Sequence, residues 1–112
     1  MAKSVLSLCG DYEYILSRID DAVLNKSFSA SYEDGVTVSS DDGYTCGMRV
    51  YERYSLSGGN RVSLSVFFCG RDNRYKVTFI TSGGSEALFF KLNTWGEESF
   101  LKSVVSELYD LE

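Results

Sequence analysis

The residue types that usually carry catalysis are missing or isolated in this chain. Histidine, the commonest general base and metal ligand near neutral pH, does not occur. Serine is frequent, but no serine stands beside a group that would activate it as a nucleophile. Cys9, Cys46 and Cys69 are far apart and form no Cys-x-x-Cys pair, which argues against a zinc knuckle or a thioredoxin-type centre. We therefore expect no familiar catalytic centre, no metal site and no bound cofactor.

Neighbouring carboxylates and paired glycines are the next candidates for chemistry. Adjacent acids such as Asp20–Asp21 and Asp41–Asp42 point in different directions on a helix or a strand, so they do not form an acid–base pair. Neither glycine pair matches a nucleotide-binding loop. The segment Ser82–Ser85 stays a candidate for anion binding, because the backbone N–H groups of a glycine turn can hold an anion.

Charge is distributed unevenly along the chain. Residues 1–42 carry 3 basic and 8 acidic side chains, a net charge of −5. Residues 43–91 carry 7 basic and 3 acidic ones, a net of +4, and residues 92–112 carry 1 and 5, a net of −4. The overall charge of −5 repels phosphates, so nucleic acid is not an expected partner. The positive charge of the central segment instead indicates a local contact surface.

Hydrophobic periodicity predicts strands and two helices. The predicted strands share β-type composition or alternation of apolar and polar residues, and they cover residues 3–9, 28–38, 44–54, 62–69 and 75–81. Asp11 is a candidate N-cap for a helix that ends near Asn25, and a capping box of Thr94 and Glu97 predicts a helix to about Tyr109. Two points stay open: a turn at Asp34–Gly35, and a short sixth strand over residues 87–92.

These elements predict an α+β fold. The order is β-α-β-β-β-β-α, with the sixth strand as an optional addition before the last helix. At 112 residues the chain fits a single domain, residues 1–112. Short connections between the later strands favour an antiparallel sheet, and two helices with one apolar stripe each should cover one of its faces in a two-layer arrangement.

The chain resembles known proteins in two ways. Its element order is similar to that of one TATA-binding-protein repeat and of the helix-grip folds that bind lipids and plant hormones. The amino-acid sequence resembles a family of small bacterial proteins of about 110 residues and unassigned function, over residues 50–54, 57–62, 81–85 and 95–98. The first resemblance implies a fold and little about function. The second covers nearly the full length and implies no activity, so it assigns no functional residue.

Strand alternation divides the central strands into two faces. If Cys46, Met48 and Val50 face the helices together with the even-numbered apolar residues from Val62 to Val66, the remaining residues form an open face. We predict that this face makes the contact with a partner through Arg49, Tyr51, Arg53, Phe67, Lys76 and Ile80. Arginine and tyrosine are enriched at interfaces, and Phe67 and Ile80 are unexpected on a solvated face. Four possibilities stay open for this face: it is solvated, or it contacts a second copy of the chain, a small anionic ligand or another protein.

These observations predict a non-catalytic binding or interaction module. Its partner could be a second copy of the chain, bound through the open sheet face. The alternative is a binder of a small anionic molecule, or an unusual enzyme, with a pocket between the sheet and the C-terminal helix. Its predicted lining is Tyr54, Trp95 and the turn of Ser82, Gly83, Gly84 and Ser85.

Compartment follows from cysteine usage and from the apolar runs. A chain with only 3 cysteines is unlike a secreted disulfide scaffold, so we expect a reducing cytoplasm. The run Val66–Cys69 is far shorter than the roughly 18 residues of a membrane span, so no membrane contact is expected.

Overall fold

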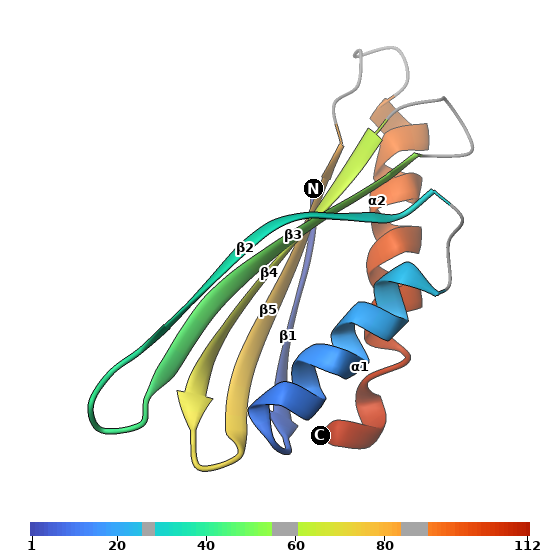
Figure 1. Ribbon diagram of the computed structural model, residues 1–112. Helices are drawn as coiled ribbons and strands as arrows, with labels where there is room; N and C mark the ends of the chain where they lie inside the picture. Colours follow the sequence, from blue (N-terminus) through green and yellow to red (C-terminus); the bar gives the residue numbers. More distant parts are fainter. Residues whose placement is uncertain (26–28, 55–60, 84–89) are drawn as a thin grey trace.

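The computed structural model describes residues 1–25, 29–54, 61–83 and 90–112, and for residues 90–97 it describes the backbone alone. The elements follow one another in the order β1, α1, β2, β3, β4, β5, α2 and a short 3-10 helix η2 (Figure 1). Their bounds are β1 Ala2–Cys9, α1 Tyr12–Leu24, β2 Ser31–Ser39, β3 Thr45–Tyr54, β4 Arg61–Arg71, β5 Arg74–Gly83, α2 Phe90–Val105 and η2 Tyr109–Leu111.

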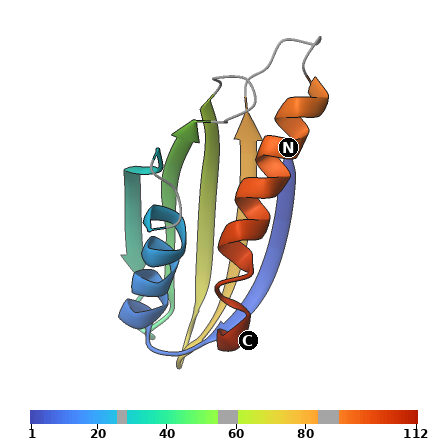
Figure 2. The same cartoon turned by 90° about the vertical axis from the view of Figure 1, so that its right-hand side faces the viewer.

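The strands form one antiparallel sheet in the order β1-β5-β4-β3-β2. Both helices lie on the same face of this sheet, α1 in front of β2 and β3 and α2 in front of β5 and β1 (Figure 2). The core lies between the layers, because the buried residues come from the helix-facing sides of the strands and from the apolar stripes of the helices. The predicted two-layer α+β class is therefore confirmed.

The last helix begins earlier than its capping signal indicates. Helix α2 starts at Phe90, so Thr94 lies inside the helix and is not its N-cap. The optional sixth strand over residues 87–92 is wrong for residues 90–92, which are helical, and its first part lies outside the described residues. Periodicity does not separate a helix from a strand over so few residues.

Strand β2 continues through the position where the sequence left a turn open. Asp34 pairs with Val50 and Gly35 with Arg49, so the chain stays in the sheet at this point. The register shifts between Tyr32 and Asp34, which makes Glu33 the extra residue of a β-bulge. A tight turn joins β4 to β5, in which Asp72 and Asn73 have φ values of 56° and 62°.

The two faces of β3 are the reverse of the sequence prediction. Tyr51 is fully buried, and Arg49 pairs across the sheet with Val66, whose side chain belongs to the core. Arg49, Tyr51 and Arg53 therefore face the helices, and their predicted place on the open face is wrong. Cys46, Met48 and Val50 take that place instead, since residues alternate along a strand.

The reversal has a steric reason. Gly47 lies opposite Phe68, and a Cβ atom at Gly47 would stand only 2.3 Å from the ring of Phe68. The ring of Phe68, which is buried in the core, therefore occupies the space over Gly47 on the helix side. The opposite register would place a methionine or cysteine side chain where this ring lies. The predicted faces of β4 and β5 are confirmed, because Val62, Leu64, Val66, Val77 and Phe79 are buried.

Candidate interaction surface

The face of the sheet opposite the helices carries rows of residues that cross all the strands. The central row has apolar side chains on four of the five strands: Val5, Thr78, Phe67, Met48 and Val36. On one side of it runs the row Lys3, Ile80, Ser65, Val50 and Asp34. On the other side runs the row Ser7, Lys76, Cys69, Cys46 and Val38. We call these three rows the open face.

Large apolar side chains on the open face are exposed to solvent. Phe67 is 50% exposed, Val36 60% and Val38 63%, and Val5 and Met48 are exposed as well. In a sheet with one solvated face, residues along each strand normally alternate, with apolar residues toward the core and polar residues toward water. Here apolar residues lie on four of the five strands of the central row among polar neighbours, and an exposed group of large apolar side chains is typical of an interaction surface. Phe67, Lys76 and Ile80 lie here as predicted, whereas whether they contact a partner stays a prediction.

Charge on the open face is divided between its two halves. Lys3 and Lys76 lie on β1 and β5, and Asp34 lies at the opposite edge on β2. Within the described part of the chain these three side chains make no ion pair. Glu52, the next residue of β3 on this side after Val50, is paired with Arg61 at 2.9 Å. One half of the open face is therefore basic and the other is acidic.

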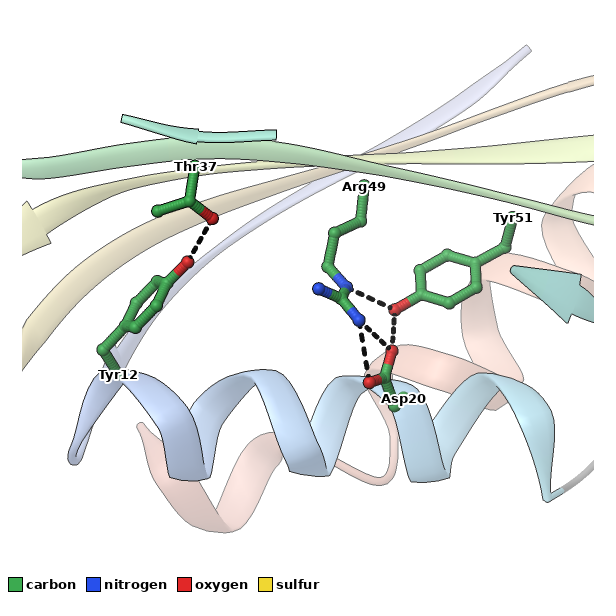
Figure 3. A network of polar contacts seen from close by, with 5 residues as sticks. All are labelled: Tyr12, Asp20, Thr37, Arg49 and Tyr51. Atoms are coloured by element: carbon green, nitrogen blue, oxygen red, sulfur yellow. Dashed lines mark hydrogen bonds and ion pairs between the residues drawn. The ribbon is translucent and has the colours of Figure 1, made fainter. Parts of the chain in front are cut away.

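Arg49 and Tyr51, predicted as contact residues, belong instead to a polar network under helix α1 (Figure 3). The Nη2 atom of Arg49 donates to both carboxylate oxygens of Asp20, at 3.0 and 2.9 Å. Its Nε atom donates to the hydroxyl of Tyr51 at 3.1 Å. The Tyr51 hydroxyl in turn donates to Asp20. The ring of Tyr32 lies 4.8 Å from the guanidinium carbon of Arg49 and covers it from the β2 side.

This network joins the helix layer to the sheet. Helix α1 stands over β3 and β2, and long polar side chains fill the space between them (Figure 3). Burial and the hydrogen bond to Asp20 both raise the pKa of Tyr51 above its ordinary value of 10.0. A second bridge runs from Tyr12 of α1 to Thr37 of β2. Each polar group therefore has a partner, so the network acts to position α1.

Arg53 is half-buried on the helix side of β3. Its guanidinium carbon lies 4.3 Å from the ring centroid of Phe100 in α2, which is a cation–π contact. Burial lowers its pKa, and no carboxylate among the described residues pairs with it. Arg53 therefore covers the end of the core and is not available to a partner on the open face.

The alternative site between the sheet and the C-terminal helix is not assembled as predicted. Tyr54 is on the face of β3 that points away from α2, is 50% exposed and stacks with Arg61. Ser82 follows the buried Thr81, so alternation places it on the open side as well. Gly83 ends strand β5. Gly84, Ser85 and the side chain of Trp95 lie outside the described residues.

Hollows between described residues occur at other places. One, of about 560 Å³, lies between β1 and α2 and is lined by Lys3, Glu98 and Lys102 among others. A groove of about 490 Å³ lies where β4 turns into β5, and its lining includes Cys9, Cys69, Tyr44, Arg71, Arg74 and Lys76. No cluster of possible metal ligands occurs among the described residues. None of the helices, as far as they are described, is long and apolar enough to cross a membrane.

Fold and surface together define a small two-layer α+β protein whose open face carries exposed apolar side chains. The chain belongs to a family of unknown function, DUF6054, whose family model matches residues 1–112. The predicted membership in a family of small proteins of unassigned function is thereby confirmed. No curated protein and no solved structure matches the chain. The resemblance to a TATA-binding-protein repeat therefore stays a prediction.

Proposed function

We propose that the protein is a non-catalytic interaction module that pairs with a second copy of itself through the open face. The observation that carries this proposal is the exposed apolar row across the sheet, with Phe67 at its centre on β4. Two antiparallel sheets that meet face to face exclude water from such rows and form a sandwich about 10 Å thick.

The whole sheet face opposite the helices, with the open face at its middle, has the size of a stable interface. Strands β3, β4 and β5 have 10 to 11 residues. With five strands at about 4.8 Å spacing and about 33 Å of length, the whole sheet face measures about 800 Å². A standard protein–protein interface buries about 800 Å² on each partner.

Charge complementarity favours one arrangement of the two copies. A two-fold axis parallel to the strands and running along β4 places the β1 edge of one copy over the β2 edge of the other. The basic half with Lys3 and Lys76 then covers the acidic half with Asp34. An axis across the strands would place like charges together, which costs energy. We propose the first arrangement, in which Phe67 meets its own copy at the axis.

Sedimentation equilibrium tests the proposal with one variant and a matched control. Phe67→Glu places two carboxylates against each other in an apolar contact, so the dissociation constant should rise about 30-fold or more. Tyr109→Glu changes an aromatic residue that is 56% exposed on η2 and should leave the association unchanged. A wild-type chain that stays monomeric at high concentration, or equal association of both variants, would contradict the proposal.

We also propose a cytoplasmic location, which the low number of cysteines supports. A fusion to a reporter that fluoresces only in the cytoplasm provides the check.

A further inference from the structure

The three cysteines, which the sequence separates widely, gather at one end of the open face. Cys46 and Cys69 are direct partners on β3 and β4, and their Sγ atoms lie 2.9 Å apart. Cys9 is at the end of β1, is exposed, and lines the same groove as Cys69. Residues directly opposite on antiparallel strands have Cα atoms about 4.5 to 5.5 Å apart, within the range of a disulfide. The pairing therefore places Cys46 and Cys69 at a Cα separation that a disulfide can span.

The groove beside Cys69 is suited to an anionic reactant. Arg71, Arg74 and Lys76 line it, and Lys76 is the direct partner of Cys69 on β5. Arg71 lies 3.7 Å from Asp42 and from Asp72, which are exposed, whereas Arg74 and Lys76 make no ion pair in the part of the chain that the structure describes. These cations attract an anion to the thiol of Cys69.

We propose that Cys46 and Cys69 are a dithiol site that reacts with anionic low-molecular-weight disulfides and closes into an intrachain disulfide. The Cys69 thiolate attacks one sulfur of the small disulfide, the S–S bond breaks, and one small thiol leaves after taking up a proton. The Cys46 thiolate then attacks the Cys69 sulfur of the mixed disulfide, and the second small thiol leaves. The protein loses two protons and two electrons, and the small disulfide takes up both and is reduced to two thiols.

The order of attack follows from the surroundings of the two sulfurs. Cys69 lines the groove, whereas Cys46 lies next to it on the side of β2. The hydrogen bond to Cys69 and partial burial raise the pKa of the Cys46 thiol. Cys69 is therefore the attacking thiol, and Cys46 resolves the mixed disulfide.

The test uses oxidised glutathione on the reduced full chain, followed by thiol titration and peptide mapping. The number of free thiols should fall from 3 to 1, and mapping should find a Cys46–Cys69 peptide pair. Cys9→Ser should still form the bond, whereas Cys69→Ser should not. Bonding of Cys9 to Cys69, stable mixed disulfides on both thiols, or no reaction would overturn the proposal.

Two further measurements separate this inference from the proposed self-association. Cys46, Cys69 and Lys76 lie on a row that the proposed dimer covers, so the reaction is that of the dissociated chain, and the bond should form faster in Phe67→Glu at low concentration than in associated wild type. In this Phe67→Glu background, Lys76→Glu should slow the reaction with glutathione about 5-fold without slowing it for the cationic disulfide cystamine. Equal slowing for both reagents would overturn the anion preference. Formation only in associated protein, as a covalent dimer through Cys69, would overturn the intrachain site.

Discussion

The guanidinium of Arg49 shows how the surroundings of a residue decide its role. Arginine and tyrosine on a strand are typical of an interface, yet Asp20 on α1 draws Arg49 and Tyr51 to the helix side. The side chains of Arg49 and Asp20 are 21% and 33% exposed, so water screens the pair only in part. The three groups satisfy one another and fix the position of α1 on the sheet.

Removal of the acid tests this role. Asp20→Ala leaves a half-buried guanidinium and a buried hydroxyl without their acceptor, which should lower the free energy of unfolding by about 1–3 kcal/mol. Asp21→Ala alters the exposed neighbour and should change it by less than about 0.5 kcal/mol. Urea denaturation of both variants measures the difference. Equal effects would show that the network does not hold α1.

The hydroxyl of Tyr51 makes stability depend on alkaline pH. Its pKa is raised in the folded protein above its value of 10.0 in an unfolded chain. The unfolded chain therefore loses its proton first, so the stability from this group is complete below pH 10 and declines as pH rises above it. Denaturation at a series of pH values should show this decline, and Tyr51→Phe should make it shallower. An unchanged slope in Tyr51→Phe would refute the assignment.

At the scale of the elements, the contact of Phe68 with Gly47 fixes the register in which β3 pairs with β4. A Cβ atom at Gly47 would also stand 2.7 Å from the carbonyl oxygen of Val36. Gly47→Ala should therefore destabilise the protein by about 1–3 kcal/mol through overpacking.

Phe68→Leu has a smaller side chain, so it should recover part of this lost stability in the double variant. Thermal denaturation of the single and double variants measures this coupling between the two positions. Strictly additive effects would mean that the two residues do not share this space.

Element order, helix number and the faces of β4 and β5 could be predicted from the sequence, because their alternation is clear. The face of β3 could not, since Cys46, Met48 and Val50 alternate as well as Gly47, Arg49 and Tyr51 do. The faces follow from the register of β3 with β4. Tyr54 pairs with Arg61, so odd-numbered residues of β3 share a face with even-numbered residues of β4. The clustering of Cys46 and Cys69 depends on the same register.

The edge strand β2 has features that disfavour pairing with another sheet. It carries Glu33 and Asp34, and its bulge at Glu33 interrupts the regular ladder. Charges and bulges at an edge disfavour pairing with the edge of another sheet. Pairing through the β2 edge is therefore disfavoured, which supports the proposed association through the open face.

At the scale of the whole molecule, the division of charge across the open face predicts a compensation between variants. Lys3→Asp and Asp34→Lys should each weaken self-association about 2- to 5-fold, because each places like charges together across the interface. The double variant exchanges the two charges and should recover the wild-type affinity. Sedimentation equilibrium of the three variants measures the effect. Additive weakening in the double variant would contradict the proposed axis.

The most direct test of the proposed dimer is a zero-length carbodiimide cross-link between Lys3 and Asp34 in the wild-type protein. Within one chain these residues lie at opposite edges of the sheet, about 19 Å apart, so such a link cannot form inside a monomer. Lys3 and Glu98 line the same hollow and provide an internal control for a link within one chain. We predict a Lys3–Asp34 peptide pair that combines isotopes when labelled and unlabelled protein are mixed. Links from Lys3 to Glu98 alone, with none to Asp34, would contradict the face-to-face dimer.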